Sequence, residues 1–243
     1  GIDLGYFECI GYGTVVDSLA AIKTLVFDEN ELTMAGFYQI VMDDFAGHEV
    51  LRERILNRLP HFGNNEPLTD GLMRQVTELA RVSCEGIVTL LGGRAVPGAY
   101  SYLEHVRKGQ ETPATPDGRR GHTALAAASS PVQGCEVHGP TASILSATCW
   151  DQEPFMGGVA INLMLQPLGA ATRESLKAII KTVMDRGGLQ LQVNCVSTET
   201  LLDARRNPRA HRDLVVRIGG FSDFFTALSP ELQDEIVRRD SHA

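Results

Sequence analysis

Short apolar segments and amphipathic segments alternate through the second half of the chain, and this alternation limits the folds open to it. The apolar segments have the length of strands rather than of buried helices. The segments between them repeat apolar side chains at helical spacing, and one ends at the pair Gly187-Gly188, a common helix stop. We therefore predict an α/β fold, with strands at 159–165, 189–196 and 214–218 and helices at 173–186, 199–206 and from Ser229 onward.

The first half of the chain has a different pattern, mostly helical and then rich in loops. Residues 92–140 contain many glycines and prolines, and 112–121 (TPATPDGRRG) is predicted to be a loop or turn region. Asp17 or Ser18 is expected to serve the N-terminus of the first helix. Helices are predicted at 15–27, 33–45, 48–59, 69–91 and 140–149.

Composition excludes several classes of function. The chain has 22 Lys and Arg against 30 Asp and Glu, a formal net charge of −8, so it lacks the basic surface that nucleic acid requires. No apolar run reaches the roughly 18 residues of a membrane span, and the N-terminus does not resemble a secretory signal. The five cysteines include no CxxC pair, so we predict neither a disulfide framework nor a zinc-ribbon site, and we assign no metal ligands. A reducing cytoplasm is the expected location.

Several local features favour ordinary structural roles. Gly11 and Gly13 lack the third glycine of a dinucleotide-binding motif, and no strand is predicted before them. His105 and His138 lie in Gly- and Pro-rich surroundings and are predicted to be exposed loop residues. The acidic pair at 234–235 is predicted to be a solvated helix face.

One segment carries a more specific signal. The apolar strand at 214–218 leads directly into Gly219 and Gly220, and aromatic residues follow. A tight turn with positive φ and an aromatic core explains this pattern by itself.

The hexapeptide at 217–222 (RIGGFS) resembles the C-terminal signature of the glycyl radical enzymes, a family that includes pyruvate formate-lyase and the radical dehydratases and decarboxylases. The segment before Gly220 is more similar to the dehydratase and decarboxylase branch. Further resemblances occur in the same order as in the family, at 17–23 (DSLAAIK), 115–120 (TPDGRR), 130–134 (SPVQG), 139–142 (GPTA), 190–194 (QLQVN) and 212–216 (RDLVV). The resemblance therefore covers nearly the whole chain.

The resemblance implies the C-terminal half of a ten-stranded α/β barrel with the glycyl radical loop and domain. The barrel part would span 1–120 and the glycyl radical domain 121–243. Gly220 would carry the radical, and Gly219 takes a position where the family commonly has Ala or Ser. A Cα radical is stabilised when the atom becomes planar and conjugates with both flanking amides, and glycine has no side chain to strain that planarity.

The resemblance also implies how the radical is made and kept. No cofactor would be bound; a separate radical SAM activating enzyme would remove a hydrogen atom from Gly220, and the stored radical would then generate a transient thiyl radical on a cysteine. The aromatic residues that follow would form a shell that excludes competing reactions, namely Phe221, Phe224 and Phe225.

The sequence departs from the family at the catalytic cysteine, whose usual Gly-Cys-Val-Glu-like loop is not found. Cys9 is the one early candidate for the thiyl residue, although it aligns beyond the usual loop. The chain is therefore expected to be a C-terminal portion or subunit that needs an N-terminal half. Tyr100, Ser101 and Tyr102 either line the substrate cavity or face the core from a strand.

The expected function is cleavage of a C–C, C–O or C–N bond in a small organic substrate, in a lyase that is dehydratase- or decarboxylase-like rather than a strict formate acetyltransferase. The expected partners are the activating enzyme and a second copy or a complementary N-terminal chain, in an anaerobic cytoplasm, without nucleic acid or membrane. Two alternatives stay open: an autonomous glycyl radical protein that repairs an oxygen-damaged partner, and an inactive fragment.

Overall fold

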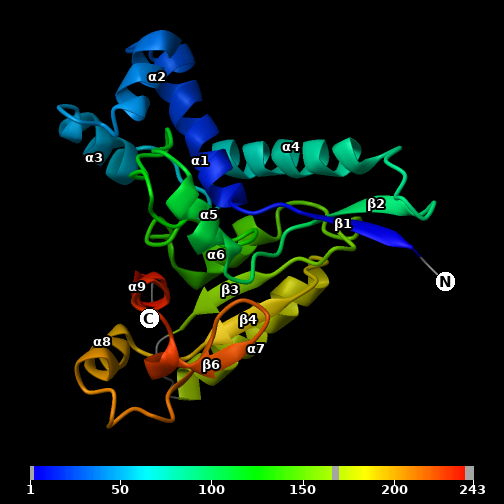
Figure 1. Cartoon of the computed structure of the whole chain (residues 1–243), viewed down its shortest axis with the longest axis vertical. Coiled ribbons are helices and arrows are strands. Elements are labelled where there is room, and N and C mark those ends of the chain that lie inside the picture. The colour runs from blue at the N-terminus through cyan, green and yellow to red at the C-terminus, as the bar shows by residue number, and fades with distance from the viewer. Residues whose placement is uncertain (1–2, 166–169, 239–243) are drawn as a thin grey trace.

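The computed structural model describes residues 3–165 and 170–238 (Figure 1). Its helices are α1 (Tyr12–Ile22), α2 (Met34–Met42), α3 (Glu49–Arg58), α4 (Pro67–Cys84), α5 (Glu104–Glu111), α6 (Gly139–Ala147), α7 (Ala170–Asp185), α8 (Thr198–Arg206) and α9 (Pro230–Arg238). Its strands are β1 (Leu4–Glu8), β2 (Arg94–Gly98), β3 (Ile161–Met164), β4 (Leu191–Asn194), β5 (Val215–Arg217) and β6 (Ser222–Phe224). A π-helical segment, Lys23–Asp28, extends α1, and a 3-10 turn, Phe225–Ala227, follows β6.

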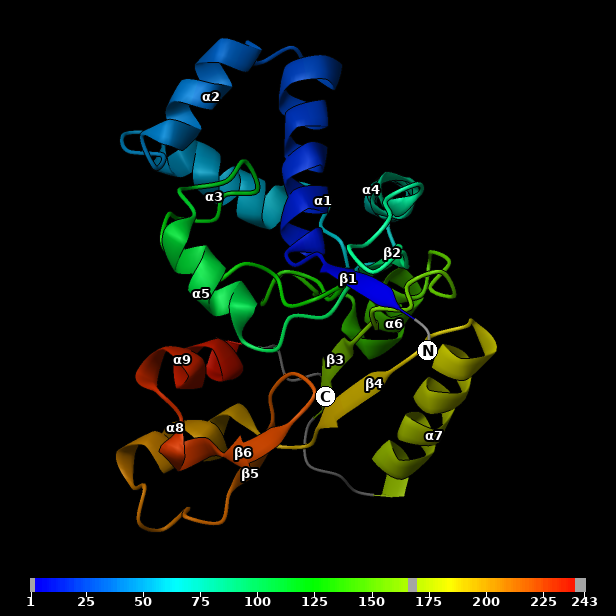
Figure 2. The same cartoon turned by 45° about the vertical axis from the view of Figure 1, so that its right-hand side comes forward.

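The strands form short two-stranded pairs along the middle of the molecule. β1 pairs in parallel with β2, and β3 pairs in parallel with β4. A parallel bridge between Ala99 and Val159 connects the end of β2 to the segment that leads into β3. Figure 2 shows helices α1–α4 on one side of these strands and α7 and α8 on the other. The predicted α/β class is therefore confirmed.

Helix α7 makes the crossover that the parallel pair β3–β4 requires, because parallel neighbours cannot be joined by a tight turn. The side chains between this helix and the two strands form one apolar cluster, which includes Ile161, Leu163, Ile179 and Val183, with Leu191 and Val193 packed against it. These side chains hold one face of β4 against α7. The other face of β4 is left for polar contacts with the segment that follows.

The structure moves several predicted boundaries. Helix α1 starts at Tyr12 instead of residue 15, because Gly11 adopts φ +78° and begins the helix. Asp17 and Ser18 therefore lie inside this helix and do not cap it. Helix α4 ends at Cys84 instead of 91, because Gly86 turns the chain at φ +78° and Val88 then pairs with Arg94.

Three strands and one helix were not predicted: β1, β2, β6 and α5. All three residues of β6 are exposed, and β1 is nowhere fully buried, so neither strand shows an apolar alternation. Pro97 lies within β2. Because proline is rare inside strands, the sequence pattern does not indicate a strand there. A strand does precede Gly11, contrary to expectation, although the missing third glycine still excludes the dinucleotide motif.

Two residues predicted to be solvated are buried together. His105 lies on α5 and is 1% exposed, and Glu235 lies on α9 and is 4% exposed. The His105 Nε2 atom is 3.2 Å from Glu235 Oε1, and Ser101 Oγ is 3.2 Å from His105 Nδ1. The loop and surface predictions failed here because the partners are 130 residues apart in sequence. His138 is exposed, as predicted.

No helix in the ranges 3–165 and 170–238 is long and apolar enough to cross a membrane.

Candidate functional site

The two glycines of the RIGGFS segment lie at the tip of a β-hairpin. Strands β5 and β6 pair antiparallel, with Arg217 opposite Ser222. The Ile218 N–H donates to the Phe221 carbonyl at 2.9 Å and closes the turn. Gly219 is buried and Gly220 is partly buried, so the tip of the hairpin points into the molecule rather than into solvent.

Geometry restricts both glycines before any chemistry is considered, and it restricts Gly220 more strongly than Gly219. Gly220 adopts φ +90°, and the Tyr100 hydroxyl occupies the place that a Cβ atom would take. A Cβ at Gly219 would lie 2.7 Å from the Tyr102 carbonyl oxygen. Any larger residue at 220 would displace Tyr100 and strain the backbone.

The peptide group between Gly219 and Gly220 is held at both ends. The Tyr100 hydroxyl donates to the Gly219 carbonyl at 3.2 Å, and the Gly220 N–H donates to Gln192 Oε1 at 3.0 Å. These two bonds fix the plane of one of the amides that flank the Gly220 Cα. A fixed amide plane is the requirement for conjugation with a radical at that carbon.

Strand β4 supplies a second anchor two residues after Gln192. The Asn194 side chain donates to the Arg217 carbonyl and accepts from the Arg217 N–H, both at 2.7 Å. This amide side chain therefore pairs with β5 as a neighbouring strand would. Gln192 is 4% exposed and Asn194 is 7% exposed, so the hydrogen bonds of both side chains are shielded from water. The segment 190–194 is part of the family resemblance, but the sequence carries no signal for the roles of these two amides, because their partners lie 23 and 28 residues away.

The three predicted substrate residues, Tyr100, Ser101 and Tyr102, lie next to this hairpin but have different surroundings. The Tyr100 and Tyr102 rings pack edge to face, with centroids 4.5 Å apart. Burial raises the pKa of the Tyr100 hydroxyl, which keeps it protonated and able to donate. Ser101 is buried against His105, whereas Tyr102 is 57% exposed. A substrate-binding role for the three residues stays a prediction.

The aromatic shell predicted around Gly220 needs correction. Phe225 is fully buried in a cluster with Leu201, Val216 and Ile218, and Phe221 packs against the same cluster. Phe224 is 48% exposed, because β6 pairs with β5 alone and its residues face outward. Two of the three rings thus support the hairpin, and Tyr100 covers Gly220.

The cysteines are distributed over the chain. Cys9 follows β1, and its N–H donates to the Gly98 carbonyl, so it lies at the same strand ends as Tyr100. Its side chain packs against the cluster of Tyr12 and Val16. Cys84 is buried, Cys149 is partly buried and Cys195 is exposed. Among the described residues, no hydrogen bond connects Cys9 to Gly220, so its thiyl role stays a prediction.

Comparisons with known proteins match both halves of the chain. Residues 2–109 match the family model for pyruvate formate lyase-like proteins, and residues 125–226 match the model for the glycine radical domain, which includes Gly220. The chain belongs to the glycyl radical enzyme family.

Relatives in this glycyl radical enzyme family are dehydratases and lyases. The chain is 38% identical over 96% of its length to a probable dehydratase of Escherichia coli, and 36% identical over its full length to an isethionate sulfite-lyase of Nitratidesulfovibrio vulgaris. The glycerol-bound, B12-independent glycerol dehydratase of Clostridium butyricum superimposes with a TM-score of 0.94 at 31% identity, over 100% of this chain and 31% of that one. The chain spans 30% of the length of the two curated relatives.

Proposed function

We propose that this chain stores a radical on the Cα of Gly220 and serves a glycyl radical dehydratase or lyase. The observation that carries this proposal is the Gly219–Gly220 peptide group, held by Tyr100 on its oxygen and by Gln192 on its N–H. Loss of a hydrogen atom from Gly220 leaves a carbon that must flatten and conjugate with its amides. A peptide plane already fixed in position lowers the reorganisation that this step requires.

The proposed reaction class is cleavage of a C–O, C–C or C–N bond in a small organic substrate, because the relatives named above are dehydratases and a lyase. The radical would be installed by a radical SAM activating enzyme under anaerobic conditions. The chain's own residues hold the hairpin, keep the Tyr100 hydroxyl protonated and limit access to the Gly220 Cα.

We further propose that the thiyl cysteine is supplied by polypeptide outside residues 1–243, and that the strands seen here form part of a ten-stranded barrel completed by it. The parallel pairs β1–β2 and β3–β4, joined by the Ala99–Val159 bridge, have the order expected for consecutive barrel strands. A homodimer or a complementary N-terminal chain would provide the remainder.

The decisive test compares two neighbouring glycines by electron paramagnetic resonance. The chain is incubated anaerobically with an activating enzyme, S-adenosylmethionine and a reductant. We expect a doublet from the single remaining Cα hydrogen, which collapses to one line when the protein is made with α-deuterated glycine.

Gly220→Ala should abolish the signal. Gly219→Ala should keep it after the Tyr102 carbonyl shifts to admit the new Cβ, because the hydrogen atom that is removed belongs to Gly220. A doublet that survives in Gly220→Ala and disappears in Gly219→Ala would move the radical to the other glycine. A doublet unaffected by either change would refute the proposed site.

A further inference from the structure

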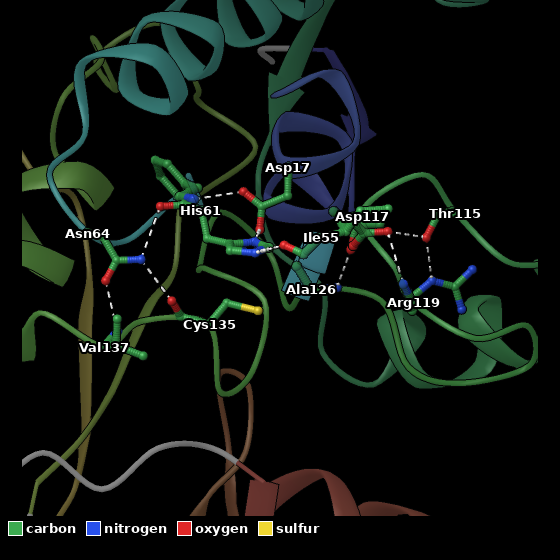
Figure 3. A network of polar contacts seen from close by, with 12 residues as sticks. Asp17, Ile55, His61, Asn64, Thr115, Asp117, Arg119, Ala126, Cys135 and Val137 are labelled. Atoms are coloured by element: carbon green, nitrogen blue, oxygen red, sulfur yellow. Dashed lines mark hydrogen bonds and ion pairs between the residues drawn. The ribbon is translucent and has the colours of Figure 1, made fainter. Parts of the chain in front are cut away.

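A second polar centre lies away from the hairpin, where three segments distant in sequence meet. Asp17 comes from α1, His61 from the loop after α3, and Cys135 from the loop before α6 (Figure 3). Their oxygen, nitrogen and sulfur atoms all lie within 4.8 Å of one another. Asp17 is 2% exposed and His61 is 6% exposed, so these two side chains are closed off from bulk solvent, whereas Cys135 is partly buried.

The His61 ring is oriented from behind by the main chain. Its Nε2 atom is 2.9 Å from the Ile55 carbonyl oxygen, which can only accept, so Nε2 carries a hydrogen. The Nδ1 atom therefore faces Asp17 Oδ2 at 2.9 Å. Histidines that bind metal ions commonly donate one ring N–H to a backbone carbonyl and leave the other nitrogen for the ion, and His61 has this orientation.

The other two ligands are held as firmly. Asp17 Oδ1 accepts from the Phe62 N–H at 2.7 Å, which leaves Oδ2 to contact His61 Nδ1. Asn64 connects the two loops, because its Nδ2 donates to the Cys135 carbonyl at 2.8 Å and to the His61 carbonyl at 3.1 Å. Its Oδ1 accepts from the Val137 N–H at 2.7 Å and secures the far side of the Cys135 loop.

The charges of the loaded group would balance. A thiolate and a carboxylate bring two negative charges, a neutral imidazole brings none, and one divalent ion cancels the two. The bound site would therefore leave no uncompensated charge in the interior.

We propose that Asp17, His61 and Cys135 bind one divalent transition-metal ion of the zinc class. A thiolate, an imidazole and a carboxylate suit zinc and disfavour magnesium or calcium, which prefer oxygen ligands alone. Zinc bond lengths of about 2.0–2.3 Å place tetrahedral donors roughly 3.5 Å apart. Small side-chain movements are enough to open the Asp17–His61 contact to that spacing and bring Cys135 in.

Three protein ligands leave one tetrahedral position for water or a small anion. Cys135 also borders a cavity of about 520 Å³ that is lined by Arg119, Arg120 and Asp117 among others, so solvent reaches the sulfur side of the group. The ion would cross-link α1 to two loops and stabilise the folded chain. This inference does not depend on the radical chemistry proposed for Gly220.

Cobalt(II) provides a direct probe, because a thiolate ligand gives a sulfur-to-cobalt charge-transfer band and tetrahedral sites absorb strongly in the visible. Chelator-treated chain is titrated with cobalt(II) in the absence of oxygen. We expect saturation at one ion per chain and displacement by zinc. The band should be lost in Cys135→Ser and retained in Cys195→Ser, which removes an exposed thiol.

A proton count covers the case in which Cys135→Ser fails to fold, as judged by circular dichroism. Zinc binding to the wild-type chain, measured by calorimetry in buffers of different ionisation enthalpy, should release protons near neutral pH, because a thiol must lose its proton to bind the ion. The proposal is overturned by a cobalt band of equal size in folded Cys135→Ser, by the absence of one-to-one saturation, or by binding without proton release.

Discussion

At the scale of single residues, the Gly220 position is determined by its neighbours as much as by its own chemistry. Gly220 has a positive φ, and the Tyr100 hydroxyl occupies the place of its missing Cβ. The Gly220 N–H also donates to Gln192. A glycine would be needed here even without a radical. The contact that distinguishes a radical site from an ordinary turn is the one that fixes the adjoining peptide plane.

Tyr100→Phe should weaken that control without unfolding the chain. The change removes one hydrogen bond to the Gly219 carbonyl, worth about 1 kcal/mol of unfolding free energy. We expect a correspondingly small shift in the denaturant midpoint and a faster decay of the radical signal, since the peptide plane is released. Tyr38→Phe, at an exposed position, is the control. Equal decay rates in the two variants would contradict a positioning role.

Asp117 should give the stability of the chain a defined pH dependence. Burial raises the pKa of its carboxyl from 3.8 to about 6, against the opposing hydrogen bond from Thr115. The folded chain therefore binds this proton more tightly than the unfolded chain does. Its contribution to stability is lost as pH rises from about 4 to about 6, and the loss is roughly 3 kcal/mol for a shift of about two units.

The measurement compares Asp117→Asn with the wild type by urea unfolding between pH 4 and pH 7. The wild type should lose stability relative to the variant as pH rises through this window, because the asparagine does not titrate. Asp213→Asn, at an exposed position, should follow the wild-type curve. Parallel curves for Asp117→Asn and the wild type would show that the carboxyl has an ordinary pKa.

At the scale of elements, β4 has two buried faces with different tasks. Leu191 and Val193 pack toward α7, whereas Gln192 and Asn194 are directed to the hairpin of β5 and β6. A strand with alternating apolar and polar residues commonly exposes its polar face. Here the polar face is buried because its amides replace the main-chain partners that β5 would otherwise lack.

Asn194→Ala should loosen the hairpin more than a typical surface change. The variant leaves the N–H and the carbonyl of Arg217 without their amide partner, at a cost of about 2–3 kcal/mol. We expect faster hydrogen exchange at the Arg217 amide and at neighbouring hairpin amides. Gln39→Ala on α2, where the side chain is exposed, should leave that exchange unchanged. Unaltered protection in Asn194→Ala would show that packing alone holds the hairpin.

At the scale of the whole molecule, contacts between distant segments bring the end of the chain back onto its middle. Helix α9 lies beside α5 in Figures 1 and 2, and the buried His105–Glu235 contact joins them. Tyr100, just before α5, reaches the hairpin that precedes α9. The hairpin is therefore supported from β4 on one side and from the segment around residues 100–105 on the other.

Oxygen should cut the activated chain at the radical. Mass spectrometry under denaturing conditions after exposure to air should show two fragments that divide at Gly220, the smaller one containing residues 221–243. Because α9 is held to α5, the two fragments should stay together in native size-exclusion chromatography. Gly220→Ala should stay intact in air. Cleavage elsewhere, or an equal cut in Gly220→Ala, would place the radical at another residue.

The amino-acid sequence by itself determined the α/β class, the helices that flank β3, β4 and β5, and the family resemblance that points to Gly220. These features depend on local patterns: helical spacing in α7, the Ser-Pro start of α9, and six consecutive residues around the glycine pair. Such signals are contained within one turn of helix or one short segment. They need no knowledge of which segments meet in space.

Only the tertiary structure decided what surrounds the glycine and what is buried elsewhere. Tyr100 and Gly219 are 119 residues apart, His105 and Glu235 are 130 apart, and Asp17, His61 and Cys135 come from three separate segments. A buried polar side chain is stable only when a partner satisfies it, and the chain's path supplies that partner from a distant segment. Hence the sequence identified the glycine, whereas the fold determined which peptide plane is fixed, which aromatic ring covers it, and which three side chains form a candidate metal site.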